Sequence, residues 1–308
     1  MNLSILNKFK INRVNAIIYR SDKKILLKKN ISQNDFIGDW NFVNEAIEYH
    51  ESEIDAFRKL LKLNFNIEIK KNIQLNCLKN EGNLLINHYF PLNLEDEKLN
   101  FKSTNKSEYG WFSLCEIIDL NLSPQLYLNL KFIFNFFETI FSNYIESIHK
   151  DFELKLIKKY KLEKKNNRVF YAKKQNFELS YQCLYLFLLL STIRKIPVSR
   201  ICLHNNDKSL IHEMYMFHSC PSEVGPLKQL TFESISYHII DGSLEIEILD
   251  NNKLSVTLSS KKDGTGGISS YRMNPSDFRI IKSISEFCIF LEVNNGPFKD
   301  EDTIWLKN

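Results

Sequence analysis

The chain has 308 residues, of which 44% are hydrophobic and 25% are charged, a composition that excludes a disordered or fibrous protein. This length fits two domains of ordinary size, each able to bury a core. Its 41 basic and 37 acidic residues leave a net charge of only +4, so the charge gives no reason to expect a nucleic-acid partner.

The cysteines and the apolar runs indicate where the protein works. The six cysteines are spread along the chain without a Cys-x-x-Cys pair, which favours free thiols in a reducing compartment over a disulfide framework. Residues 1–13 contain no apolar segment of a signal peptide. The longest apolar run, residues 183–190, is well short of the ~20 residues that a membrane span needs. We therefore expect a cytoplasmic protein with no membrane span.

The first part of the chain predicts a β-hairpin followed by an amphipathic helix. Residues 14–19 and 25–27 are β-rich runs around a polar turn. From Ser52 onward the apolar residues follow helical spacing, and Ser52 is a suitable N-cap. Later predicted elements are strands at 84–90 and 108–112, a turn with a short helix at 114–118, and an aromatic-rich helix at 126–140.

The stretch from 40 to 67, WNFVNEAIEYHESEIDAFRKLLKLNFNI, resembles the Nudix box, Gly-x5-Glu-x7-Arg-Glu-U-x-Glu-Glu-x-Gly-U, with U aliphatic. Glu51 falls on the first Glu and Lys59 on the Arg. Among Nudix proteins the chain is most similar to the GDP-mannose mannosyl hydrolases, which share the Ala-Phe-x-Arg-Leu helix, a His-Tyr strand (here His88-Tyr89) and a Tyr-x-Trp-Leu-like segment (here residues 109–112). The resemblance implies a Nudix α/β/α sandwich over residues 1–142.

Most of the metal-binding residues that this resemblance implies are absent. Mg²⁺ needs hard oxygen ligands, but Leu63-Asn64 stand where the Nudix box has its metal-binding Glu pair. Glu45, Glu48 and Glu51 remain as candidate metal ligands, or they form a solvated acidic loop.

The residues that the resemblance assigns to catalysis are also changed. The subfamily has a Gln metal ligand and a His general base at the positions of Asn105 and Lys106. A protonated lysine cannot take a proton from water, although it can bind a phosphate. His88 is a further catalytic candidate, with a structural hydrogen bond as the alternative. Hydrolysis by the Nudix route is therefore not expected.

The second part of the chain changes from helical to β-rich patterns. Residues 143–167 are Lys-rich with helical spacing and predict a connecting helix with a solvated basic face. Asp241-Gly242 and residues 250–252 are candidate hairpin turns. The remaining predictions are a strand at 169–171, an apolar helix at 179–192, and short strands at 201–203, 213–218, 237–240, 244–249, 253–258, 271–273 and 287–293. Such a pattern favours a β-sandwich or a small barrel.

Four separated blocks resemble a WbuC-type cupin: SRICLH from 199, HEM from 212, SYHIIDG from 236 and FLEVNNGPF from 290. The resemblance implies a double-stranded β-helix (jelly-roll) domain at 168–308. A cupin metal site has a Pro-His-x-His pair, a Glu and a C-terminal His, ligands that suit a transition metal. At these positions the chain has Leu227, Gln229, Ile235 and Arg279, so we predict no bound metal.

Several histidines remain in this half of the chain. His204, His212, His218 and His238, with Glu213, are its richest set of potential ligands. His212 and Glu213 are adjacent, so in a strand their side chains point to opposite faces. His204 and His238 are weak candidates for a metal or ligand site, with a satisfied core histidine as the alternative.

These patterns predict an α+β protein in which both domains keep their folds and lose their metal sites. The leading hypothesis is a non-catalytic protein that binds a nucleotide-sugar or glycan, or holds a partner, in bacterial O-antigen metabolism. An alternative is a divergent Nudix hydrolase that uses Mg²⁺ or Mn²⁺ to release sugar from a GDP-hexose, and a third possibility is a structural homodimer. Candidate catalytic residues are Glu51, His88 and Lys106; candidate ligand-binding residues are Glu45, Glu48, Asn64, Asn105, Lys106, Gln229, His238 and Arg279.

Overall fold

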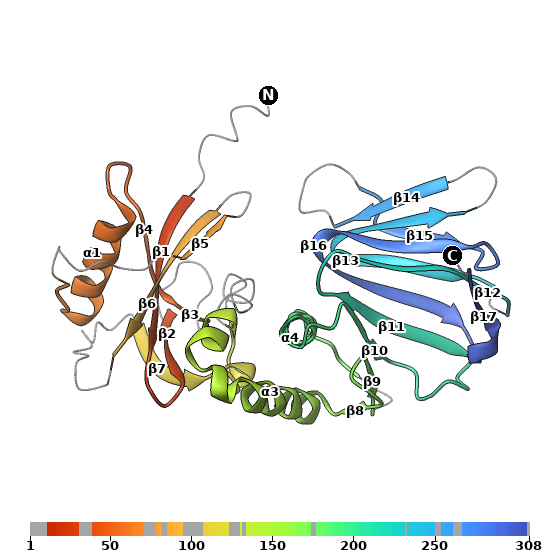
Figure 1. The fold of residues 1–308 in the computed structure, drawn as a ribbon, viewed down its shortest axis with the longest axis horizontal. Coiled ribbons are helices and arrows are strands. Elements are labelled where there is room, and N and C mark those ends of the chain that lie inside the picture. Colours follow the sequence, from red (N-terminus) through yellow and green to blue (C-terminus); the bar gives the residue numbers. More distant parts are fainter. Residues whose placement is uncertain are drawn as a thin grey trace. The chain divides into compact units, whose positions relative to one another are not determined.

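The structure is a computed structural model that describes residues 11–30, 39–69, 78–81, 85–94, 107–122, 130, 134–173, 177–231, 233–249, 254–260 and 267–306. The chain divides into two compact units, Met1–Asn129 and Leu130–Asn308. Each unit has its own sheet, as Figure 1 shows. Within the described ranges, no helix has both the length and the apolar character required to cross a membrane.

The sheet of the first unit is built around β1. Strand β6 pairs with β1 in parallel, and β2 and β4 pair with it in antiparallel orientation. The predicted hairpin is confirmed, because Tyr19 of β1 faces Ile25 of β2. The described strands are β1 (Ile11–Tyr19), β2 (Lys24–Asn30), β3 (Trp40–Asn41), β4 (Val43–Ala46), β5 (Leu78–Glu81), β6 (Leu85–Asn93) and β7 (Ser107–Ser113), followed by the 3-10 helix η3 (Glu116–Asp119).

Helix α1 (Glu53–Phe65) packs on one face of this sheet (Figure 1). It begins where Ser52 Oγ accepts a hydrogen bond from the Asp55 backbone N–H at 3.1 Å, and it ends at Asn66, which has a left-handed φ of 56°. Its buried face follows the i, i+3, i+4 spacing of the sequence and includes Phe57, which stacks on Phe90 of β6 with ring centroids 4.5 Å apart. The predicted helix is confirmed.

The second unit contains a larger sheet in which β16 is the central strand. The strand order is β14-β13-β16-β11-β10-β9-β8. Outside this order, β12 pairs with β16 and β17, and β15 pairs with β13. The described strands are β8 (Leu162–Lys164), β9 (Val169–Ala172), β10 (Val198–Cys202), β11 (Ile211–His218), β12 (Ser222–Gln229), β13 (Ile235–Ile248), β14 (Leu254–Ser259), β15 (Ser270–Met273), β16 (Arg279–Asn295) and β17 (Thr303–Trp305), with the 3-10 helix η6 (Asp300–Asp302) before β17.

The hairpin predicted at Asp241-Gly242 is wrong, because β13 continues through this pair. Ile239 pairs with Phe290, and Leu244 pairs with Ser283, so β13 stays on β16 on both sides of the irregularity. Gly242 has φ of +87°, and a Cβ there would lie 2.2 Å from the Phe287 carbonyl oxygen. The Asp-Gly pair therefore makes a bulge instead of a turn. The turn predicted at 250–252 lies outside the described residues.

Helix α3 (Ile145–Tyr160) is shorter than the helix predicted over 143–167. Lys161 has a left-handed φ of 51° and ends the helix, and the residues after it form β8, which pairs with β9. The buried residues of α3 are Phe152, Glu153 and Leu156, so this segment packs into the second unit. The basic side chains of residues 143–167 were expected to be solvated, but Lys164, which lies on β8, forms an ion pair with Glu153.

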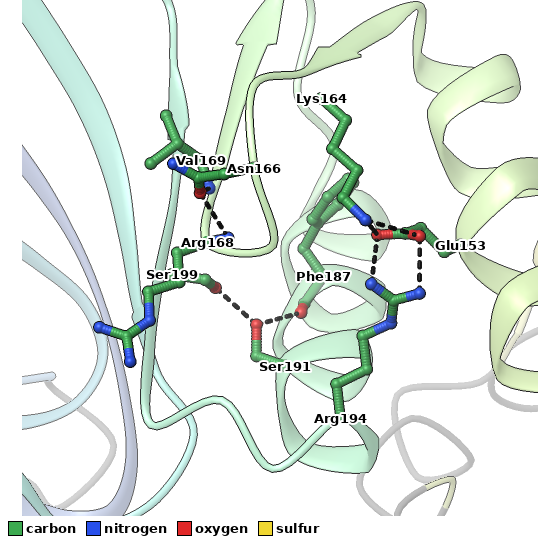
Figure 2. Close-up of polar contacts among 9 residues, drawn as sticks. All are labelled: Glu153, Lys164, Asn166, Arg168, Val169, Phe187, Ser191, Arg194 and Ser199. Carbon is green, nitrogen blue, oxygen red and sulfur yellow. Dashed lines mark hydrogen bonds and ion pairs between the residues drawn. The ribbon is translucent and has the colours of Figure 1, made fainter. Parts of the chain in front are cut away.

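Helix α4 (Tyr181–Ile193) confirms the apolar helix predicted at 179–192. Nine of its 13 residues are buried, which explains why the sequence shows no continuous polar face. Ser191 is a buried polar exception: its Oγ donates to the Phe187 carbonyl and lies 2.5 Å from Ser199 Oγ (Figure 2). The few helices and two sheets confirm the predicted α+β class.

Candidate functional site

The loop glutamates of the first unit lie beside a lysine. Lys59 Nζ forms an ion pair with Glu48 and lies 3.9 Å from Glu51 Oε1. Glu51 Oε2 also accepts the backbone N–H of Glu48 at 3.3 Å. The hydrogen bond from Lys59 lowers the pKa of Glu48. One ammonium group thus lies beside the two carboxylates that a metal ion would need.

Asn64 is held in a hydrogen-bonded cluster on the same side of α1. Its side-chain N–H donates to the Leu60 carbonyl at 2.9 Å, and its Oδ1 accepts from Tyr109 Oη at 2.9 Å and from Lys28 Nζ at 3.4 Å. Burial lowers the pKa of Lys28, and the nearby Glu45 carboxylate opposes this shift. Two lysines, Lys28 and Lys59, therefore accompany the candidate ligands Glu45, Glu48, Glu51 and Asn64.

His88 lies on β6 and is 5% exposed. Its Nδ1 is 3.9 Å from Glu53 Oε1, at the start of α1. The imidazole therefore lies beside the first turn of the helix that covers the strand. Asn105 and Lys106 lie outside the described residues.

The second unit has a cavity of about 740 Å³ that is open to solvent on one side. Its lining combines three arginines with carboxylates, an amide, a histidine and several apolar side chains. The lining residues are Arg168, Val169, Pro197, Val198, Ser199, Arg200, Met216, His218, Ser222, Glu223, Val224, Gly225, Leu227, Gln229, Arg279, Ile281, Phe290, Glu292, Phe298, Asp300, Thr303 and Trp305. A cavity of this size and mixed chemistry is typical of a small-molecule site.

Arg279 is a fixed part of the cavity wall, since it is only 1% exposed. Its Nε donates to Tyr237 Oη at 3.0 Å, its Nη1 donates to the Pro275 carbonyl at 3.4 Å, and its Nη2 donates to Gln229 Oε1. The structure therefore brings Gln229 and Arg279, two of the predicted ligand-binding residues, into direct contact. Their hydrogen bond joins β12 to the start of β16.

Arg200 and Glu292 also line the cavity, and both keep unused hydrogen-bonding groups. The Arg200 guanidinium makes no hydrogen bond or ion pair with any described residue, and its Nε is buried. Glu292 Oε1 accepts from Asn294 Nδ2 at 3.2 Å, whereas Glu292 Oε2 has no hydrogen-bond partner among the described residues. Burial raises the pKa of Glu292, and the positive charges of Arg279 and Arg200 oppose that rise.

His218 is the histidine that reaches the cavity lining. Its Nδ1 lies 2.8 Å from Ser222 Oγ, and burial lowers its pKa to about 4. The imidazole is therefore neutral at pH 7 and can serve as a hydrogen-bonding group, not as a charge.

The other histidines lie away from the cavity lining. His204 and His212 stack with ring centroids 4.0 Å apart, and burial followed by the neighbouring His212 lowers the pKa of His204 to about 4. His238 Nδ1 forms a hydrogen bond with Ser270 Oγ at 3.0 Å. Because His238 follows Tyr237 on β13, the two side chains point to opposite faces of the strand. Neither His204 nor His238, the two weak candidates for a metal or ligand site, is among the residues that line the cavity.

The described residues of the two candidate sites offer few ligands to a divalent metal. Across the described ranges, no group of three or more His, Cys, Asp or Glu side chains is arranged to hold a metal ion. At the aligned cupin positions, Leu227 and Ile235 are apolar, Gln229 is neutral and Arg279 is cationic. A guanidinium repels a metal ion.

Sequence reasoning missed Arg200 and Glu292, although a signal for both exists. Alternate residues of β16 point to one face, so Glu292 shares the face of buried Cys288 and Phe290. In β10, Arg200 likewise shares the face of Cys202. A charged residue at an inward position of an apolar strand is the pattern that indicates such a site.

Millimolar Mg²⁺ or Mn²⁺ is expected to leave the melting temperature of the protein unchanged. Lys59 and Lys28 already compensate the loop carboxylates, so a cation gains little by entering. Differential scanning fluorimetry with and without EDTA measures this. A stabilisation by metal that Glu51→Gln removes, and that the exposed control Glu68→Gln retains, would contradict the prediction.

No protein-family model matches the chain, and no curated protein matches it. Similar solved structures include the Nudix domain of NrtR from Shewanella oneidensis in complex with ADP ribose, which is 14% identical, covers 40% of this chain and 84% of that chain, and has a TM-score of 0.31. A cupin superfamily protein from Desulfitobacterium hafniense is 13% identical over 32% of this chain and 76% of that chain, with a TM-score of 0.25. WlaRA, a TDP-fucose-3,4-ketoisomerase from Campylobacter jejuni, is 21% identical over 28% of this chain and 59% of that chain, with a TM-score of 0.24. The sequence resembles these same two kinds of protein, Nudix domains and cupins.

Proposed function

We propose that the protein binds a nucleotide-sugar or a glycan in the cavity of the second unit and does not hydrolyse it with a metal ion. The observation that carries this proposal is the pair of unused groups in the cavity, the Arg200 guanidinium and Glu292 Oε2. The Arg200 Nε is a buried N–H group without a described partner, and such a group is costly to the folded protein. A ligand that accepts a hydrogen bond from this guanidinium accounts for its presence in the cavity.

The cavity walls suit a sugar because they offer both apolar and polar surface. Phe290, Phe298 and Trp305 provide aromatic surface for the apolar face of a sugar ring, and Gln229, His218 and Glu292 provide groups for its hydroxyls. The volume of about 740 Å³ lies within the range of ligand sites for small molecules.

The role we propose is that of a binding or scaffolding protein in the cytoplasmic stage of bacterial surface-polysaccharide (O-antigen) metabolism. The sequence resemblance to WbuC-type cupins and GDP-mannose mannosyl hydrolases is the support for this setting. The lysine-paired carboxylates of the first unit support the absence of metal-dependent hydrolysis.

A thermal-shift screen of nucleotide-sugars, read beside a turnover assay, tests the proposal. We expect at least one GDP-, UDP- or TDP-linked sugar to raise the melting temperature, equally with Mg²⁺ and with EDTA. We expect no free sugar or nucleotide to be released. Release that EDTA abolishes would replace the proposal with the divergent hydrolase, and no shift with any nucleotide-sugar or surface glycan would remove the binding function.

A further inference from the structure

We propose that Arg200 binds the anionic group of the ligand and that Glu292 accepts a hydroxyl of the same molecule, so that the cavity selects a sugar bearing a phosphate or a carboxylate. This inference rests on the proposed function and names the ligand class of that site. Phosphate and carboxylate share one chemistry here, because both accept paired hydrogen bonds from a guanidinium.

The two inner arginines of the cavity differ in what they already contact. Three nitrogens of Arg279 donate to Tyr237, Pro275 and Gln229, so its orientation and much of its hydrogen-bonding capacity are committed to the protein. Arg200 has no such partner among the described residues. Five N–H donors and a full charge therefore remain available at Arg200. Arg279 is a structural residue, and Arg200 is the one that can bind a ligand.

Strand pairing places Arg200 and Glu292 on the same inner surface. Arg200 of β10 pairs with Met216 of β11, which pairs with Phe290 of β16. Glu292 is two residues further along β16, so it shares the face of Phe290. Strand spacing and rise put the Arg200 and Glu292 backbones about 12 Å apart. One sugar with a phosphate or carboxylate substituent can span the space between the two side chains.

The polarity of the ligand follows from the signs of the two groups. An ionised Glu292 repels a second anion and accepts hydroxyl hydrogen bonds, so the anion of the ligand lies at Arg200 and its hydroxyls lie toward Glu292. The side chains of Met216 and Phe290, which pair in the row of Arg200, also line the cavity. An uncharged sugar would leave Arg200 unpaired and is expected to bind weakly.

Substitution of Arg200 separates binding from stability. Arg200→Met removes a charge that has no described partner, so the ligand-free variant is expected to melt at the same temperature as the wild type or higher. Arg279→Met is expected to melt lower, because it leaves Gln229 and Tyr237 without their partner. The exposed Arg272 on β15 gives a matched control, Arg272→Met.

Isothermal titration of the full chain with glucose 1-phosphate, glucuronate, glucose and inorganic phosphate identifies the ligand class. We expect binding of glucose 1-phosphate or of glucuronate, according to which anion the site takes, and at least tenfold weaker binding of glucose. Arg200→Met should weaken the binding of the anionic sugar about 10- to 100-fold, and Glu292→Gln by about tenfold, as expected for charge-assisted hydrogen bonds. Arg272→Met should not change it.

Several outcomes would overturn the inference. Unchanged binding in Arg200→Met excludes Arg200, even where the wild type binds nucleotide-sugars as proposed. Equal binding of glucose and glucose 1-phosphate excludes selection for an anion, and equal binding of inorganic phosphate excludes recognition of the sugar by Glu292. A lower melting temperature in ligand-free Arg200→Met shows that the guanidinium serves the fold. If no sugar of the titration or of the thermal-shift screen binds the wild type, the proposed function itself fails.

Discussion

Replacement of Glu153 by Gln is expected to lower the free energy of unfolding of the second unit by about 3 kcal/mol, as when a buried ion pair loses one partner. Glu153 is 4% exposed, and its carboxylate accepts hydrogen bonds from both Arg194 Nη atoms at 2.6 Å (Figure 2). Lys164 Nζ forms an ion pair with the same carboxylate at 3.0 Å. Without the carboxylate, two positive charges remain next to each other. The loss lies near the low end of the range because Arg194 and Lys164 are 20% and 30% exposed.

Urea unfolding followed by circular dichroism measures this loss. Glu146→Gln, an exposed position on the same helix, is the control and should change the stability little. In a double-mutant cycle, Arg194→Met should cost less in the Glu153→Gln background than in the wild type, because the pair is already broken. A loss below about 1 kcal/mol for Glu153→Gln would show that solvent screens the cluster as it does at a surface.

Acidification from pH 7 to pH 4 is expected to destabilise the second unit by several kcal/mol. The folded pKa of His204 and of His218 is about 4, below the ordinary value of 6.5, so the unfolded chain binds more protons between these values. The stability that both imidazoles provide above pH 6.5 is therefore lost as the pH falls toward 4, on the order of 3 kcal/mol for each. Burial also lowers the pKa of His149 and His212, which adds in the same direction.

Glu292 acts in the opposite sense. Its folded pKa is raised, so its ionisation costs stability as the pH rises through that pKa, and its protonation relieves that cost in acid. We expect the four histidines to outweigh it. Unfolding in urea at a series of pH values tests the sum. His218→Gln should reduce the pH dependence. A stability that is flat from pH 7 to 4 would contradict the prediction.

The local elements could be predicted wherever spacing and capping agree. The N-cap Ser52 and the helical spacing of apolar residues predicted α1, and the polar turn between two β-rich runs predicted the β1–β2 hairpin. The bulge at Asp241-Gly242 could not be predicted from the sequence. The same dipeptide forms a hairpin turn when the residues before and after it pair with each other. Here both flanks pair with β16, a distant segment. Strands β8, β12 and β17 were missed for the same reason, since their pairing partners determine them.

The candidate site shows a similar division. The resemblance to cupins led to Gln229 and Arg279, and both line the cavity. That resemblance could not show that Arg279 donates a hydrogen bond to Tyr237 whereas the Arg200 side chain has no described partner. This difference depends on contacts between strands that are distant in the sequence. Likewise, the carboxylate-rich loop was visible in the sequence. Its pairing with Lys59, and the hydrogen bond from Lys28 to Asn64, required the fold.

The central position of β16 also affects how the second unit is made on the ribosome. β16 pairs with β11, β12 and β13, all of which are synthesised before it (Figure 1). Until β16 emerges, β11 and β13 each have an unpaired edge, and the apolar side chains that pack against β16 remain uncovered. Long-range pairing of this kind is slow. The nascent second unit is therefore expected to be a client of chaperones, with the cavity forming among the last steps of folding.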